Sequence, residues 1–177
     1  MSAPDIPRLF EAHSLFEKTA VFDRGSFLKK GGTIDTNIYF IEEGAAYVFI
    51  LDGAEERIVR LAYKSNIVVA LDSFLTGVPS DFYIQAIKKT TVKIVRQADF
   101  QQFISRDAAN QALWTGILED LVLQQVEREK DLLIQSPLQR YQRVLKRSPQ
   151  LFQQIPNKYI ASYLRMSAET LSRLKKP

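Results

Sequence analysis

The chain has 177 residues, of which 46% are hydrophobic and 25% charged, a composition typical of a globular protein with one or two domains. It contains no cysteine, which excludes disulfides, thiolate nucleophiles, iron–sulfur clusters and cysteine zinc sites. No apolar run approaches the roughly 20 residues that span a membrane, and the first residues lack a signal-peptide pattern, so we expect a cytoplasmic protein with no membrane partner.

The first half of the chain changes from a helical to a strand-like pattern. Apolar residues at helical spacing predict a helix over 6–20. Short segments rich in Ile, Val, Tyr and Phe then alternate with glycine turns, and Asp52-Gly53 is a strong hairpin signal. Many short strands with frequent turns predict an antiparallel barrel, roll or sandwich. We expect strands at 37–41, 45–51, 57–63, 82–87 and 92–95.

Helical periodicity returns at 99–105 and over a long stretch, 110–135, before a further helix at 138–146. The first half of the long helix carries an apolar stripe that is wide for a lone surface helix. For any single residue of the stripe, packing against the core is the favoured explanation. For the stripe as a whole, we favour pairing with a second copy of the helix. The predicted dimer interface consists of Leu113, Trp114, Ile117, Leu118 and Leu121.

The stretch 156–176 contains two short amphipathic segments joined by the tight connection 165–167, the pattern of a helix-turn-helix. Ser167 is a good N-cap for the second segment. Arg165 stands where such turns usually have glycine, so it must take a strained conformation. An ordinary helical hairpin is the alternative interpretation. The residues predicted to contact DNA are Ser167, Ala168, Glu169, Ser172, Arg173, Lys175 and Lys176.

Charge is distributed unevenly along the chain. Residues 136–177 contain nine lysines and arginines and one glutamate, a net charge of +8, which leaves −4 for residues 1–135. A basic tail on a mildly acidic body is what binding to a phosphate backbone requires, although a solvated basic surface is a common alternative.

The order of elements resembles the Crp/Fnr family of bacterial transcription regulators over nearly the full length. The most specific matches are YFIEEGAAYVF at 39–49, DSFLTGVPSDFYIQA at 72–86 and KYIASYLRMSAETLSRLKK at 158–176. The resemblance implies an α+β fold with an antiparallel β-roll or jelly-roll sensor domain (1–109), a long dimerisation helix (110–135) and an all-α helix-turn-helix DNA-binding domain (136–177). The chain stops at Pro177, before the family's usual β-hairpin wing, so we expect a short domain without the wing; a wingless variant and a truncated chain are both open.

The resemblance also implies an effector pocket, but the pocket departs from the family's pattern. Cyclic-nucleotide binders have a Gly-Glu pair and, further along, Arg-Ser, whereas this chain has Val69-Ala70 and Ser80-Asp81. Without the arginine we expect no binding of cyclic AMP. Two alternatives are open: the pocket binds another small polar ligand, or the side chains of Phe74 and Phe82 fill it. The implied pocket residues are Val69, Ala70, Asp72, Ser73, Phe74, Thr76, Ser80, Asp81 and Tyr83.

The leading interpretation is a homodimeric transcription regulator that binds an inverted-repeat operator in double-stranded DNA, with no catalytic site, metal or cofactor. RNA polymerase and an unidentified small-molecule effector are the further partners considered. A cupin-like enzyme usually binds metal through clustered histidines, and His13 is the only histidine, which also argues against haem ligation. A ligand-binding or protein-interaction module without DNA binding is the remaining alternative.

Overall fold

The computed structural model describes residues 6–175, which divide into two compact units with their boundary between Arg106 and Asp107. We name them the β-roll unit, up to Arg106, and the helical unit, from Asp107. The long helix therefore belongs to the same unit as the C-terminal helices. Among the described residues, no helix combines the length and the apolarity needed to cross a membrane.

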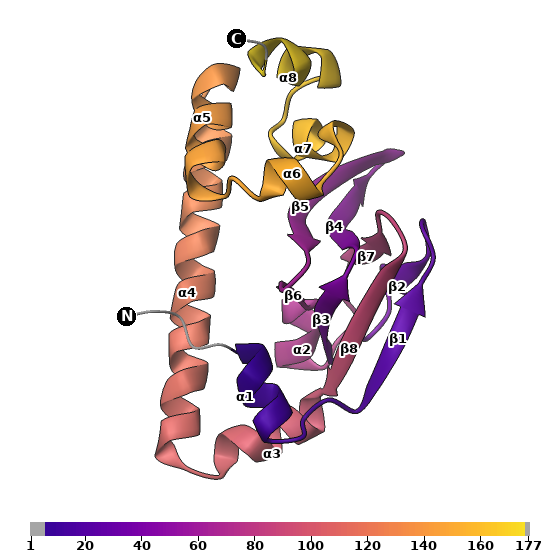
Figure 1. Cartoon of the computed structure of the whole chain (residues 1–177), viewed down its shortest axis with the longest axis vertical. Helices are drawn as coiled ribbons and strands as arrows, with labels where there is room; N and C mark the ends of the chain where they lie inside the picture. Colours follow the sequence, from indigo (N-terminus) through magenta and orange to yellow (C-terminus); the bar gives the residue numbers. More distant parts are fainter. Residues whose placement is uncertain (1–5, 176–177) are drawn as a thin grey trace. The chain divides into compact units, whose positions relative to one another are not determined.

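In the described part of the β-roll unit, two four-stranded antiparallel sheets have the orders β1-β8-β3-β6 and β2-β7-β4-β5 (Figure 1). The strands are β1 (Lys18–Phe22), β2 (Phe27–Lys29), β3 (Asn37–Glu43), β4 (Ala45–Asp52), β5 (Glu55–Tyr63), β6 (Ile67–Val68), β7 (Tyr83–Ala86) and β8 (Thr90–Arg96). The unit's helices are α1 (Ile6–Ala12), α2 (Leu71–Thr76) and α3 (Gln97–Ser105). The five predicted strands are confirmed, with ends shifted by one or two residues.

The predicted helix over 6–20 is wrong beyond Ala12. Ser14 takes a left-handed conformation (φ 52°), which ends α1. The chain then pairs as β1 with β8, Lys18 opposite Ile94 and Phe22 opposite Thr90. Pairing with a strand some 70 residues away in the sequence overrides the local helical pattern.

The core of the β-roll unit consists of small and branched side chains from both sheets, among them Ala46, Ile84 and Val92. Gly44 (φ 95°) marks a close approach of backbones, because a Cβ there would lie 2.5 Å from the Lys89 carbonyl oxygen. Helices α1 and α3 lie next to each other at one end of the unit (Figure 1). They pack through Phe10 and Phe100, whose ring centroids are 5.9 Å apart.

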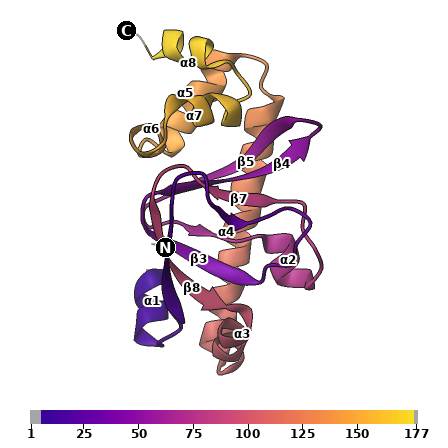
Figure 2. The same ribbon diagram turned by 90° about the vertical axis from the view of Figure 1, so that its right-hand side faces the viewer.

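The helical unit consists of five described helices, of which α5–α8 gather in one cluster (Figure 2). They are α4 (Ala108–Leu133), α5 (Pro137–Arg147), α6 (Leu151–Gln154), α7 (Asn157–Tyr163) and α8 (Ala168–Leu174). The predicted helices at 110–135 and 138–146 are confirmed as α4 and α5. Asp107 caps α4 by accepting a hydrogen bond from the Asn110 amide at 2.8 Å.

Candidate functional site

Helices α7 and α8 cross through a shared apolar face, as the spacing of their apolar residues predicted. Ile160, Ala161, Leu164 and Leu171 are all buried. The small side chain of Ala161 lies next to the turn, where its carbonyl accepts a hydrogen bond from the Met166 amide at 3.0 Å. These contacts hold the two short helices together, although each alone is too short to be stable.

Both predictions about the α7–α8 turn are confirmed. Arg165 is left-handed, with φ 55°. The Ser167 hydroxyl caps α8 by accepting a hydrogen bond from the Thr170 amide at 3.1 Å.

The guanidinium of Arg140 ties the α7–α8 turn to the end of α4. Its side chain is buried and donates to the carbonyls of Leu164 (2.8 Å) and Arg165 (3.0 Å) on one side. On the other side it donates to the carbonyls of Ile134 (2.6 Å) and Gln135 (2.9 Å). Hydrogen bonds from a charged donor are the stronger kind, so Arg140 fixes where α8 begins relative to α4. In the sequence, Arg140 is only one of the nine basic residues of the tail, and nothing there indicates this role.

An ion-pair network joins α5 to the second half of α4. The Asp131 carboxylate is fully buried and accepts from Arg143 Nε (2.9 Å) and Arg147 Nη2 (2.5 Å). Glu127 pairs with Lys130 and Arg143, and the hydrogen bond from Lys130 is the largest cause that lowers the pKa of Glu127. Three of the nine basic residues in the tail, including Arg140, are therefore engaged inside the unit, so less charge faces outward than the sequence suggests.

The residues predicted to contact DNA lie on the outer side of the turn and of α8, away from buried Leu171. Ser167, Ala168 and Ser172 are exposed and short. Glu169 and Arg173, one helical turn apart, form an exposed ion pair. The predicted DNA-contacting residues also include exposed Lys175, whose ammonium donates to Asn157 Oδ1 at 2.9 Å, and Lys176, which lies outside the described residues.

In the β-roll unit, the implied effector residues surround α2 and the segment that follows it. Ala70, Ser73, Phe74 and Ser80 are buried; Val69 and Tyr83 are half-buried; Asp72, Thr76 and Asp81 are exposed. Two of the polar residues here, Ser73 and Ser80, are hydrogen-bonded within the chain. Ser73 Oγ accepts from the Asp35 amide (3.0 Å), and the backbone of Ser80 pairs with that of Thr33.

A buried lysine that the sequence had not singled out lies against this segment. The Lys29 side chain is only 3% exposed, and its ammonium donates to the carbonyls of Ser80 (2.5 Å) and Phe82 (2.6 Å). Burial is the main cause that lowers the pKa of Lys29, while the charges of Asp72 and Asp35 act in the opposite direction. Lys29 thus supplies an internal cation beside the position of the missing arginine.

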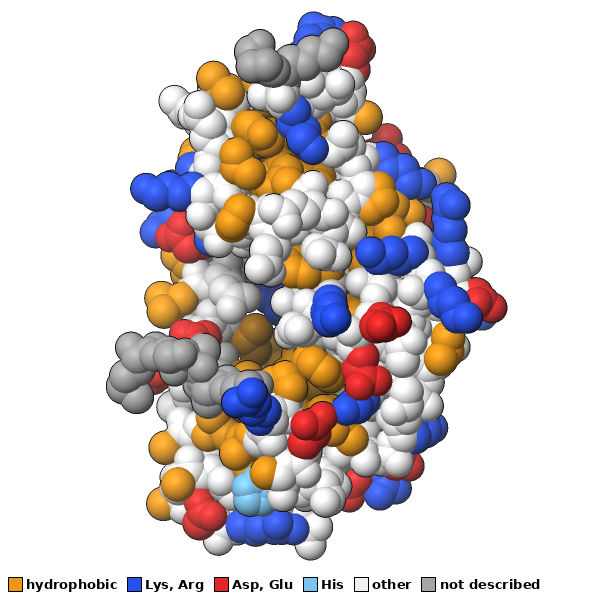
Figure 3. Space-filling model, viewed as in Figure 1, with side chains coloured by type: hydrophobic (Ala, Val, Ile, Leu, Met, Phe, Trp, Pro, Cys, Tyr) orange, Lys and Arg blue, Asp and Glu red, His pale blue; other side chains and the backbone are white. Residues whose placement is uncertain are grey.

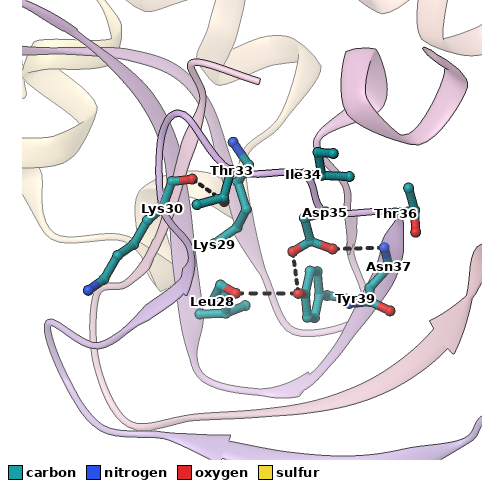
Figure 4. A pocket seen from close by; sticks show the side chains of 9 residues that line it. All are labelled: Leu28, Lys29, Lys30, Thr33, Ile34, Asp35, Thr36, Asn37 and Tyr39. Carbon is teal, nitrogen blue, oxygen red and sulfur yellow. Dashed lines mark hydrogen bonds between the residues drawn. The ribbon is translucent and has the colours of Figure 1, made fainter. Parts of the chain in front are cut away.

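The hollow of this region lies beside the implied pocket residues. A cavity of about 430 Å³ is lined by β2, the loop that follows it and the start of β3 (Figure 4). In its wall the Tyr39 hydroxyl donates to Asp35 Oδ2 at 2.5 Å, and burial raises the pKa of Tyr39. None of the nine implied pocket residues lines this cavity. Binding of an effector by those nine residues therefore stays a prediction.

The two phenylalanines considered as pocket fillers face other side chains. Phe74 packs edge-on against Phe100, with ring centroids 5.9 Å apart, and Phe82 packs against the core of the two sheets. His13 is exposed and lies outside the roll, in pale blue in Figure 3, with its ring 4.7 Å from that of Phe103.

Comparison with known proteins shows the fold. No protein-family model and no curated protein matches the sequence. Among solved structures, a CooA mutant from Carboxydothermus hydrogenoformans is similar with TM-score 0.70 and 15% identity, covering 93% of this chain and 76% of CooA. FixK2 from Bradyrhizobium japonicum gives TM-score 0.71 at 15% identity over 89% and 81% of the two chains. The catabolite activator protein of Thermus thermophilus gives 0.58 at 22% identity over 98% and 82%. The chain thus has the fold of Crp/Fnr-type regulators.

Proposed function

We propose that this chain is a transcription regulator of Crp/Fnr type, not an enzyme, that binds operator DNA as a homodimer in the cytoplasm. One observation carries the proposal. Helices α7 and α8 form a packed pair whose turn is fixed by Arg140 and whose outer side presents short, polar and charged residues. That arrangement is a helix-turn-helix, and α8 is its recognition helix.

The outer side of α8 suits the major groove. Ala168 and Ser172 are short, so the helix backbone can come close to the bases. Arginine can donate two hydrogen bonds to guanine, and glutamate can accept one from a cytosine amino group. In the free protein Glu169 and Arg173 pair with each other, and this exposed pair is weak enough for bases to replace it.

Dimerisation through α4 is the second part of the proposal. The predicted interface residues form two adjacent rows at four-residue spacing: Leu113, Ile117 and Leu121 in one, Trp114 and Leu118 in the other. The second row continues into Val122, which is 62% exposed, and Val126, which is 39% exposed. A two-fold pair of α4 helices would bury these rows and place two copies of α8 on one operator.

We further propose that the β-roll does not respond to cyclic nucleotides. Ser80 stands where the phosphate-binding arginine is expected, and the Lys29 ammonium is already bound by two carbonyls. RNA polymerase and a different small-molecule effector remain proposed partners of the regulator.

Salt dependence of DNA binding tests the function. Labelled double-stranded DNA should bind the chain with an affinity that falls steeply as salt rises, because bound lysines and arginines release counterions from the phosphates. Lys158, exposed at the start of α7, should contribute, so Lys158→Ala should weaken binding about equally on all sequences. The matched control is Lys88→Ala, which removes an exposed lysine from the β-roll unit. Absence of salt-sensitive binding would favour a ligand-binding or protein-interaction module instead.

A further inference from the structure

Arg165 is held in a backbone conformation that disfavours most residues other than glycine and asparagine. Its φ of 55° makes it the one non-glycine residue with positive φ among the described residues of the helical unit. The left-handed region brings a side chain's Cβ close to the carbonyl oxygen, and the chain tolerates this only where surrounding contacts impose it. Glycine would meet the same turn without that strain.

Hydrogen bonds around the turn impose the left-handed conformation of Arg165. The Arg165 amide donates to the Ser162 carbonyl at 3.0 Å, and the Arg165 carbonyl accepts from Arg140 Nη2 at 3.0 Å. On either side, Leu164 and Met166 are fixed by hydrogen bonds to Arg140 and Ala161. The backbone of this turn therefore needs no arginine side chain, and the reason for having one lies in what the side chain does.

The side chain itself is an unused cation. Arg165 is exposed, and its guanidinium makes no hydrogen bond or ion pair with any described residue. One cation, Arg128, lies near enough to feel it: after burial, which is the largest cause, the charge of Arg165 helps to lower the pKa of Arg128. By contrast, Arg143 and Arg147 are neutralised by Glu127 and Asp131. Arg165 thus presents a free guanidinium two residues before the cap of α8.

We propose that Arg165 binds a DNA phosphate beside the groove that α8 enters. The inference rests on the proposed function. A guanidinium matches a phosphate with two parallel hydrogen bonds, and backbone contacts of this kind fix the position of a recognition helix without reading sequence. Strain retained next to a binding surface is the expected result when a side chain is needed there for binding and not for folding.

The test is a substitution whose effects on stability and on binding have opposite signs. Arg165→Gly should raise the thermal midpoint by a few degrees, because it relieves the left-handed strain. It should weaken DNA binding about fivefold, equally on specific and random sequences, and reduce the salt slope by about 1 for each protomer. Arg165→Lys should retain most of the salt slope. Arg165→Asn tolerates the left-handed conformation without the charge, so it should lose affinity as Arg165→Gly does.

Ser65→Gly is the matched control. Ser65 is an exposed non-glycine residue with φ 69° in the β-roll unit, so its replacement should raise the thermal midpoint and leave DNA binding unchanged. Unchanged affinity and salt slope in Arg165→Gly would overturn the inference and leave the proposed function intact. A loss confined to specific sequences would overturn it too, since Arg165 would then read bases. A wild-type chain without salt-sensitive DNA binding would overturn the proposed function and the inference together.

Discussion

Replacing Asp131 with asparagine removes the carboxylate that holds α5 against α4. Asp131 is fully buried and pairs with Arg143 and Arg147, and Glu127 is the other carboxylate in the network. An asparagine of similar shape keeps the packing but not the charge, so two guanidinium groups lose their main partner.

The cost can be estimated from the exposure of those partners. Removing one member of a fully buried ion pair costs about 3–5 kcal/mol, because a charge is left buried without compensation. Here the arginine side chains are 38% and 32% exposed, so they can turn to water, and Arg143 keeps Glu127. We therefore expect Asp131→Asn to lower the free energy of unfolding by about 2–3 kcal/mol.

Urea unfolding measured by the fluorescence of Trp114, the single tryptophan and part of α4, reports on the helical unit. The loss corresponds to roughly 30- to 150-fold more unfolded protein. Asp120→Asn is the control, since Asp120 is an exposed carboxylate on the same helix. Equal, small effects of the two substitutions would show that the network is a surface feature and that the reasoning about burial is wrong.

Three further predictions address assembly, effector and base contacts. Ile117→Asp combined with Leu121→Asp should convert a dimer into a monomer that binds operator much more weakly, because the two carboxylates stand in the proposed dimer interface. A wild-type chain that is monomeric at micromolar concentration in the ultracentrifuge would refute that interface. Calorimetric titration with cyclic AMP and cyclic GMP should detect no binding, since losing the ionic partner of a phosphate costs about 2–5 kcal/mol; a dissociation constant below about 10 μM would contradict this. Arg173→Ala should cost about 1–3 kcal/mol on a specific site and relax preference at one base. Equal losses on specific and random DNA would show that Arg173 contacts only phosphate.

Local patterns in the sequence predicted those parts of the fold that local chemistry determines. The Asp52-Gly53 hairpin forms as expected, with Gly53 at φ 63° between β4 and β5. The cap at Ser167 and the left-handed turn at Arg165 follow from two short amphipathic segments separated by three residues. Each of these features depends on residues close together in the sequence.

Features that depend on distant partners could not be predicted. Strand β1 forms because β8 offers it a partner, and nothing near Lys18 indicates this. Lys29 turns inward because the register of β2 shifts between Phe27 and Lys29, which breaks the alternation that would have placed a lysine outside. Arg140 looks like surface charge until the carbonyls of two distant segments are placed around it.

The candidate site also combines features that nearby residues determine with features that the local sequence could not predict. The exposure of Glu169, Ser172 and Arg173 follows from the burial of Leu171 at helical spacing. Their contact with bases stays a prediction. The implied effector pocket rested on an alignment to a family. The hydroxyls of its two serines, Ser73 and Ser80, accept hydrogen bonds from backbone amides, and their contact with an effector stays a prediction.

Selection of bound fragments from a pool of random double-stranded DNA tests the central proposal most directly. A homodimer with one α8 in each of two major grooves should enrich an inverted repeat whose half-sites lie about one helical turn apart, roughly 34–36 Å. Arg173→Ala should lose the preference at one position in each half-site and keep the spacing. A pool that shows no enrichment after repeated rounds, or that enriches a single motif without two-fold symmetry, would contradict the proposal of a dimeric operator-binding regulator.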